Sequence, residues 1–205
     1  MKKETSDRQI EIIEAAGKLL MEKGIKGLTT KNLAQEMNFS ESALYRHFKD
    51  KEAIITHFIS YLSENINTRF ENILNSELNA EEKLTALFKS QFSFFNVNPH
   101  YIVIVLSDGL LDDSEVIKNE ILKLIQTNSI VFLKVIKEGQ NNKTFNQEID
   151  AEYLVHFAMG TFRLQMLKWK LANFSFDIEK KGMETMNNLL KLLKNRASKP
   201  NSVTN

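Results

Sequence analysis

Hydroxyl-bearing and charged side chains gather at the starts of two short amphipathic segments, residues 31–37 and 41–48. Thr29 and Thr30 stand at the start of the first segment, where a hydroxyl cap and free backbone N–H groups form a phosphate site. A lysine can donate to guanine and a glutamate can accept from cytosine, so both can read bases. The exposed residues placed to read bases are Lys31, Ser40, Glu41 and Ser42. Together they indicate a surface that binds double-stranded DNA, whereas Lys31 or Glu41 alone would equally be a solvated surface charge.

A helix-turn-helix motif is expected to position these side chains. Apolar residues spaced three or four apart predict a first helix from about residue 10, with Gly24 as its stop signal. Two short helices, 31–37 and 41–48, follow across a tight turn at Asn38 and Phe39. In this geometry the second helix of the pair lies in the major groove, with its first residues against the base edges.

The run from Leu28 to Glu52 resembles the DNA-binding signature of the TetR family. The LYRHF sequence at residues 44–48, followed by Lys51 and Glu52, is its most specific part, and the close resemblance covers about residues 8–58. It implies that Tyr45, His47 and Lys51 contact phosphates beside the groove, which fixes the register without reading sequence.

The turn departs from the family pattern at two positions. Asn38 stands where the family usually has glycine, and the turn needs a left-handed backbone there. Asparagine is among the best non-glycine residues for that conformation, so the turn is expected to form. Phe39 replaces a smaller aliphatic residue, so a slight shift in the packing of the third helix is expected.

Bulk composition fits this interpretation and excludes some others. The 205 residues carry a net charge of +1, but six basic and three acidic residues between Lys23 and Lys51 give a local charge of +3. There is no cysteine, hence no disulfide and no thiolate metal site. No signal peptide is visible, and the longest apolar run, 101–106, is far short of the ~20 residues of a membrane span. A cytoplasmic protein with no membrane partner is expected.

Helical periodicity continues through the rest of the chain, so the predicted fold is all-α with about nine helices. Further helices are expected at about 51–73, 80–95, 100–106, 114–138, 150–171 and 177–194. The predicted division is a DNA-binding domain at 1–52, a larger regulatory and dimerisation domain at 53–196, and a disordered tail at 197–205.

The middle of the chain is rich in phenylalanine, and such residues can line an apolar ligand cavity, although each one alone would equally be core. His156, Arg163 and Gln91 are candidate polar anchors, and a lone histidine on an apolar face is more often a core residue. The predicted lining residues are Phe88, Gln91, Phe92, Phe95, Tyr101, Phe132, His156, Phe157 and Arg163.

The segment 150–171 is apolar almost all round, which predicts that it is covered on more than one side. Together with 177–194 it is expected to form a four-helix interface between two subunits, as the resemblance also implies. The predicted interface residues are Gly160, Leu164, Leu167, Trp169, Met186, Leu189 and Leu193.

The resemblance therefore implies a homodimeric repressor, released from an inverted-repeat operator by an unidentified small molecule. Alternatives are a ligand-independent accessory DNA-binding protein of the same fold, an activator, and an enzyme with an appended DNA-binding module. No catalytic, zinc or phosphate-loop motif is present, so no enzyme, cofactor or metal is expected. The acidic group Asp108, Asp112, Asp113 and Glu115 is interpreted as favourable charge at a helix start.

Overall fold

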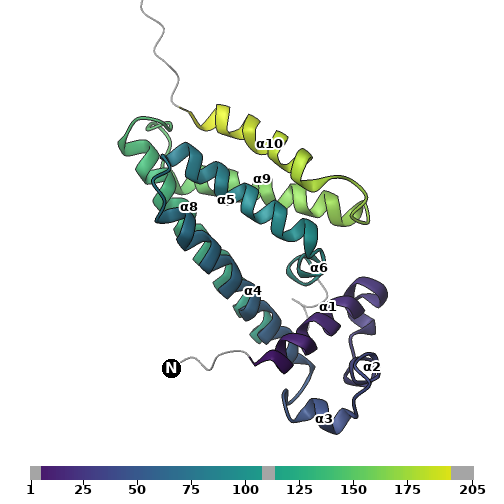
Figure 1. Cartoon of the computed structure of the whole chain (residues 1–205). Helices are drawn as coiled ribbons and strands as arrows, with labels where there is room; N and C mark the ends of the chain where they lie inside the picture. Colours follow the sequence, from purple (N-terminus) through teal and green to yellow (C-terminus); the bar gives the residue numbers. More distant parts are fainter. Residues whose placement is uncertain (1–5, 108–113, 195–205) are drawn as a thin grey trace, which may run out of the picture.

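The structure is a computed structural model and describes residues 6–107 and 114–194. Within those residues it is built from nine helices, which confirms the all-α prediction. Figure 1 shows the first three helices at one end of the molecule and the other helices beyond them. In chain order the helices are α1 (Asp7–Gly27), α2 (Thr30–Glu36), α3 (Glu41–Tyr45), α4 (Lys51–Leu74), α5 (Ala80–Val97), α6 (His100–Val105), α8 (Glu115–Asn141), α9 (Ala151–Leu171) and α10 (Ile178–Leu193).

Side-chain caps start the two short helices of the motif. The Thr29 hydroxyl accepts a hydrogen bond from the Asn32 backbone N–H at 3.1 Å, and the Ser40 hydroxyl accepts one from Ala43 at 3.2 Å. Each cap satisfies a backbone donor that has no partner within its own helix. The caps therefore fix where α2 and α3 begin, next to the polar residues of the candidate DNA surface.

Three local predictions in this region have different outcomes. Asn38 adopts φ 55°, which confirms the left-handed turn. Gly24 has φ 65°, but it makes a kink inside α1, and the helix continues to Gly27. The third helix was predicted to reach Phe48 but ends at Tyr45, since two turn residues follow before Phe48 packs into the core.

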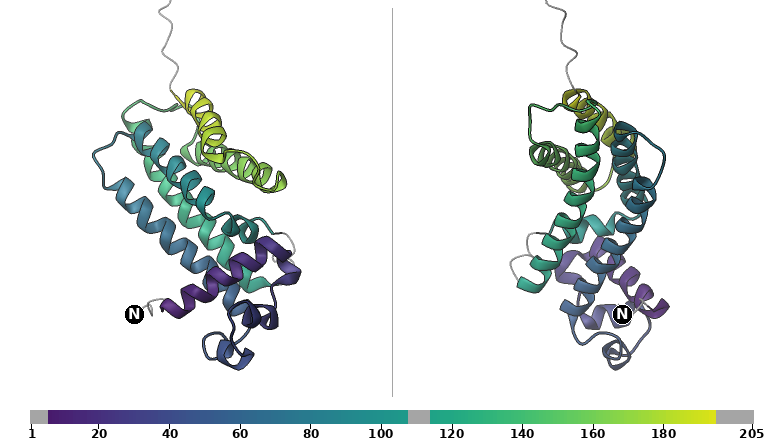
Figure 2. Two further views of the ribbon diagram at one scale, coloured as in Figure 1. Left: turned by 45° about the vertical axis from the view of Figure 1, so that its right-hand side comes forward. Right: turned by 90° about the vertical axis from the view of Figure 1, so that its left-hand side faces the viewer.

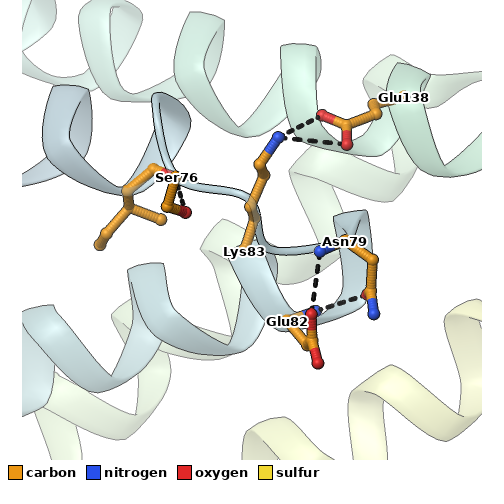
Figure 3. Close-up of polar contacts among 6 residues, drawn as sticks. Ser76, Asn79, Glu82, Lys83 and Glu138 are labelled. Atoms are coloured by element: carbon orange, nitrogen blue, oxygen red, sulfur yellow. Dashed lines mark hydrogen bonds and ion pairs between the residues drawn. The ribbon is translucent and has the colours of Figure 1, made fainter.

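Three long helices, α4, α5 and α8, form the body of the second domain, and the views of Figure 2 show them side by side. At the start of α5, Asn79 and Glu82 make a capping box (Figure 3). Lys83 reaches across to the carboxylate of Glu138 at the end of α8, with a nitrogen–oxygen distance of 3.1 Å (Figure 3). The start of α5 therefore meets the end of α8, so the two helices run antiparallel.

Helices α9 and α10 pack together against this body, with α10 lying along α5 (Figure 1). Gly182 of α10 meets the ring of Phe92, since a Cβ there would lie 2.6 Å from that ring. The Trp169 indole of α9 donates a hydrogen bond to the Phe176 carbonyl at 2.9 Å, in the connection to α10. One face of each helix is thus already buried within the same chain.

The short helix α6 joins the two ends of the molecule, because it packs against α1 as well as α4, α5 and α9. Gly17 of α1 permits this approach. A Cβ at Gly17 would lie 2.5 Å from Cδ2 of His100, at the start of α6. The His100 ring also packs edge-on against Phe58 of α4, with ring centroids 5.8 Å apart.

Gly17→Ala is expected to lower the free energy of unfolding by on the order of 1 kcal/mol. Overpacking costs about 1–3 kcal/mol, and the better helix propensity of alanine offsets about 1 kcal/mol of that. Urea unfolding at a fixed protein concentration measures the loss. In a His100→Ala background the same substitution is expected to be neutral or stabilising, because the ring is gone. If Gly17→Ala lowers the free energy of unfolding equally with and without the His100 ring, overpacking against that ring is not the cause.

Candidate functional site

The candidate DNA surface lies on α2, α3 and the turn after α3. Two hydrogen bonds join three of its predicted residues: the Thr30 hydroxyl donates to Glu41 Oε2 at 3.1 Å, and the Tyr45 hydroxyl donates to Thr30 Oγ1 at 3.4 Å. Tyr45 keeps 49% of its surface exposed, and its single hydroxyl proton must leave Thr30 to bond a phosphate. Only Oε2 of the Glu41 carboxylate is bonded to Thr30, so the carboxylate can also accept from a base.

The remaining predicted DNA contacts lie around this group. Lys31, Ser42 and His47 are exposed, and Ser40 and Ser42 share a hydroxyl–hydroxyl hydrogen bond of 2.9 Å. Lys51 is half-buried at the start of α4, and its ammonium donates to the Ile25 carbonyl at 3.4 Å. A phosphate beside Lys51 would therefore meet a cation that a backbone carbonyl holds in place.

The second domain encloses a cavity of about 530 Å³, a size suited to a small-molecule ligand. Residues of α4, α5, α6, α8 and α9 line it, and most of them are apolar. The exposed lining residues, such as Ile130 and Arg163, belong to α8 and α9, so the mouth of the cavity lies between these two helices.

The structure divides the predicted lining residues into two groups. Three lie elsewhere: Phe92 packs on Gly182, Tyr101 is buried between Phe58 and His100, and Phe157 is exposed on α9. Those three assignments are corrected because the side chains point to other neighbours. Six predicted residues do line the cavity: Phe88, Gln91, Phe95, Phe132, His156 and Arg163.

Lining residues on α4, α6, α8 and α9 were not predicted from the sequence. Their apolar periodicity marked a buried face, but periodicity does not show where opposing faces leave a gap. Asn128 gave the one local signal, as a polar residue next to the apolar stripe of α8. Among the lining residues that were not predicted are Leu62, Ile102, Val105, Leu124, Asn128 and Met159.

An interior arginine organises the polar part of the cavity wall. Arg69 of α4 donates to the Ser90 carbonyl at 2.7 Å and to Gln91 Oε1 at 3.0 Å, and it lies 4.5 Å over the Phe94 ring. Burial lowers the pKa of Arg69 to about 10, so the guanidinium remains charged at neutral pH. The arginine thus fixes the orientation of the Gln91 side chain.

A junction between α6 and α1, formed by a largely buried His100 and a half-exposed Glu14, lies between the cavity and the DNA surface. Burial lowers the pKa of His100 to about 4, and it raises the pKa of the facing Glu14 carboxyl. The two side chains lie 3.5 Å apart, from Nε2 to Oε2, and His100 Nε2 has no hydrogen-bond partner. Burial also raises the pKa of the neighbouring Tyr101 hydroxyl. At neutral pH the histidine is therefore uncharged.

The outer face of α9 carries a continuous apolar stripe, defined by Tyr153, Phe157, Gly160, Leu164, Leu167 and Leu171. These residues are exposed and recur every three or four positions, as in helices that pair along one seam. Leu164 keeps 52% and Leu171 keeps 74% of its surface exposed. An exposed apolar surface of this kind marks an interaction site.

Three of the predicted interface residues do not belong to this stripe. Trp169, Met186 and Leu193 are almost completely buried within their own chain, which corrects their assignment to a subunit interface. Leu189 is half-buried against the core. Gly160, Leu164 and Leu167 are the predicted interface residues that lie on the stripe.

Residues 6–107 and 114–194 contain no group of three or more His, Cys, Asp or Glu side chains able to hold a metal ion. None of their helices has the length and apolar character needed to cross a membrane. Asp108, Asp112 and Asp113 lie outside the described residues, and Glu115 falls in the first turn of α8.

Two family models match adjoining parts of the chain: bacterial regulatory proteins of the tetR family at residues 12–57, and the C-terminal region of YsiA-like proteins at 56–192. The nucleoid occlusion factor SlmA of Aliivibrio fischeri is 28% identical over 161 residues, 76% of this chain and 82% of that protein.

Solved structures also share the fold. A Clostridium perfringens protein described as a fatty acid metabolism regulator has a TM-score of 0.75 at 26% identity, covering 90% of this chain and 99% of that one. The transcriptional regulator FadR from Bacillus subtilis, in complex with stearoyl-CoA, has a TM-score of 0.75 at 18% identity, covering 90% and 97%.

The helix-turn-helix motif and the helical bundle define a DNA-binding transcriptional regulator that responds to ligands. The chain belongs to the TetR family of bacterial regulatory proteins, and its second domain is YsiA-like.

Proposed function

We propose that the protein is a homodimeric repressor that leaves an inverted-repeat operator when a long-chain acyl-CoA enters the cavity. The observation that carries this proposal is an apolar cavity next to α6, the helix that also packs on α1 of the DNA-binding domain. In this proposal the DNA-binding domain is residues 1–52 and the regulatory domain is 53–196.

The dimer is proposed to form through the α9 stripe. Pairing two stripes about a two-fold axis would remove both from water and would place two α3 helices on the same side of the dimer. On B-DNA such helices read half-sites ~34–36 Å apart, which is why the operator is an inverted repeat.

The chemistry of the cavity supports an amphipathic, anionic ligand. Its walls suit an acyl chain, and the exposed Arg163 lies at the mouth, where its guanidinium can pair with phosphate. Glu152 also lies at the mouth, but its position eleven residues earlier on α9 puts it about 16 Å from Arg163 along the helix. The FadR structure with stearoyl-CoA provides an example of such a ligand on this fold.

Release requires that the ligand bind one arrangement of the domains better than the other. Ile102 and Val105 of α6 line the cavity, while His100 at the start of the same helix contacts α1. A ligand that displaces α6 therefore acts directly on the position of the DNA-binding domain.

The test begins with selection of bound fragments from a genomic library at two salt concentrations. Recovery of a short inverted repeat, with affinity falling steeply as salt rises, is expected. Stearoyl-CoA should then release the operator, whereas CoA alone should not. Tyr45→Phe, which removes the hydroxyl, should weaken operator binding about tenfold, while the loss of its exposed 3.4 Å bond to Thr30 should lower stability only slightly. Sequence-independent binding, or release by neither compound, would contradict the proposal.

A ligand-independent DNA-binding role is the second candidate, because the similarity to SlmA extends over most of the chain. A packed regulatory core would favour that role, and the cavity opposes it. Operator binding that no acyl-CoA alters would support it.

A further inference from the structure

One polar atom in the cavity wall lacks a partner. Asn128 of α8 lines the cavity, and its Oδ1 is buried without a hydrogen bond. Its neighbours one turn away on the same helix are Leu124 and Phe132, both part of the apolar wall. A buried acceptor left unpaired is costly, so this atom requires an explanation.

A second amide lines the same cavity from α5. Gln91 is only 4% exposed, and its Oε1 is occupied by the Arg69 guanidinium at 3.0 Å. Arg69 is itself fixed by bonds to Ser90 and by a 2.9 Å bond from Nε to Asn65 Oδ1. With its oxygen held, the Gln91 side chain has its NH₂ group left to donate to a ligand.

The helix register places these two amides opposite each other. Lys83 at the start of α5 contacts Glu138 at the end of α8 (Figure 3). One to two turns further along α5, the Phe88 ring lies 5.1 Å from the Phe132 ring of α8. Because the helices are antiparallel, the next turn brings Gln91 of α5 level with Asn128 of α8. The register thus places a donor and an acceptor at one level, on two residues that both line the cavity.

We propose that the effector carries a hydroxyl group on its apolar chain, held between Gln91 and Asn128. A hydroxyl can donate to Asn128 Oδ1 and accept from the Gln91 NH₂ group at the same time. A plain hydrocarbon chain would bury both amides without partners. A site built around a hydroxyl discriminates strongly against the analogue that lacks it. This inference rests on the proposed function, since it names the chemical class of the ligand in the same cavity.

Binding of matched ligands to the full-length protein tests the inference. The probes are stearoyl-CoA and its 3-, 10- and 12-hydroxy derivatives, with dissociation constants measured by titration. At least one hydroxy isomer is expected to bind about tenfold or more tightly than stearoyl-CoA. Asn128→Leu should weaken that isomer and strengthen stearoyl-CoA, so that the preference disappears. Gln126→Leu is the matched control, because it replaces an exposed amide on the same helix outside the cavity lining, and it should preserve the preference.

A second measurement uses no ligand. Asn128→Leu should raise the melting temperature of the free protein by about 2–4 °C, because it removes an unpaired acceptor from an apolar wall. A lower melting temperature would overturn the inference, as would stearoyl-CoA binding as tightly as every hydroxy isomer. If no acyl-CoA binds while Asn128→Leu stabilises the protein, the proposed acyl-CoA ligand is wrong and the polar pair still requires a hydroxyl-bearing ligand of another kind.

Discussion

Leu164→Glu is expected to convert the dimer to monomers and to weaken operator binding by a factor on the order of 10²–10⁴. Leu164 lies in the middle of the α9 stripe and is 52% exposed in the isolated chain. In a two-fold dimer each glutamate would be buried near its copy, and an unpaired buried charge is strongly disfavoured. A dimer binds two half-sites at once, and a monomer binds only one. The affinity is therefore expected to fall by the factor that linking the two binding events contributes.

Sedimentation and operator titration of the same samples measure this effect. The matched control is Leu122→Glu, which places the same charge on a leucine that is 47% exposed on α8, outside the stripe. The control should remain dimeric and keep its operator affinity. A dimeric Leu164→Glu protein would show that the subunits pair through another surface. A monomer with full operator affinity would show that dimerisation does not contribute to DNA binding.

The sequence predicted the DNA-binding motif well because its determinants are local. Thr29, one of the two threonines expected at the start of the second helix, caps it, and Asn38 takes the left-handed conformation that the turn requires. Each of these features depends on a few neighbouring residues. The end of α3 was overestimated because Phe48 continues the apolar pattern although the backbone has already turned.

The regulatory site was harder to predict because its geometry depends on packing between distant helices. An apolar residue on a helix covered from several sides can face a cavity, a neighbouring helix or a partner subunit. Phe92 and Phe88 have similar sequence contexts, yet Phe92 fills the space beside Gly182 while Phe88 lines the cavity. Trp169 likewise turns inward to bond the Phe176 carbonyl. Only the relative rotation of the helices distinguishes these cases.

Protonation of His100 is expected to destabilise the protein as the pH falls from about 6.5 to about 4. The unfolded chain binds this proton with the ordinary pKa of 6.5, whereas the folded protein binds it only near pH 4. Between these values the unfolded state holds more protons, so stability falls with falling pH. The full difference corresponds to about 3 kcal/mol, and the side chain is only 13% exposed, so solvent screens little of it.

Two other titratable groups, Glu14 beside His100 and His57 of α4, act on the same pH range. The raised pKa of Glu14 favours the folded state as the pH falls, which opposes the effect of His100. The lowered pKa of His57 adds to the effect of His100. Both groups remain when His100 is replaced. The contribution of His100 is therefore the difference between the wild type and His100→Gln in how much unfolding free energy is lost as the pH falls.

Urea unfolding of both proteins at pH 7.5 and pH 4.5, at one protein concentration, provides this difference. The loss of unfolding free energy between the two pH values should be smaller in His100→Gln by about 2–3 kcal/mol. His47→Gln, at an exposed histidine of the DNA surface, is the control and should lose as much as the wild type. Equal losses in all three proteins would mean that folding does not lower the pKa of His100. The His100 side chain would then not be buried between α6 and α1. The proposed coupling of the cavity to the DNA-binding domain through this contact would lose its support.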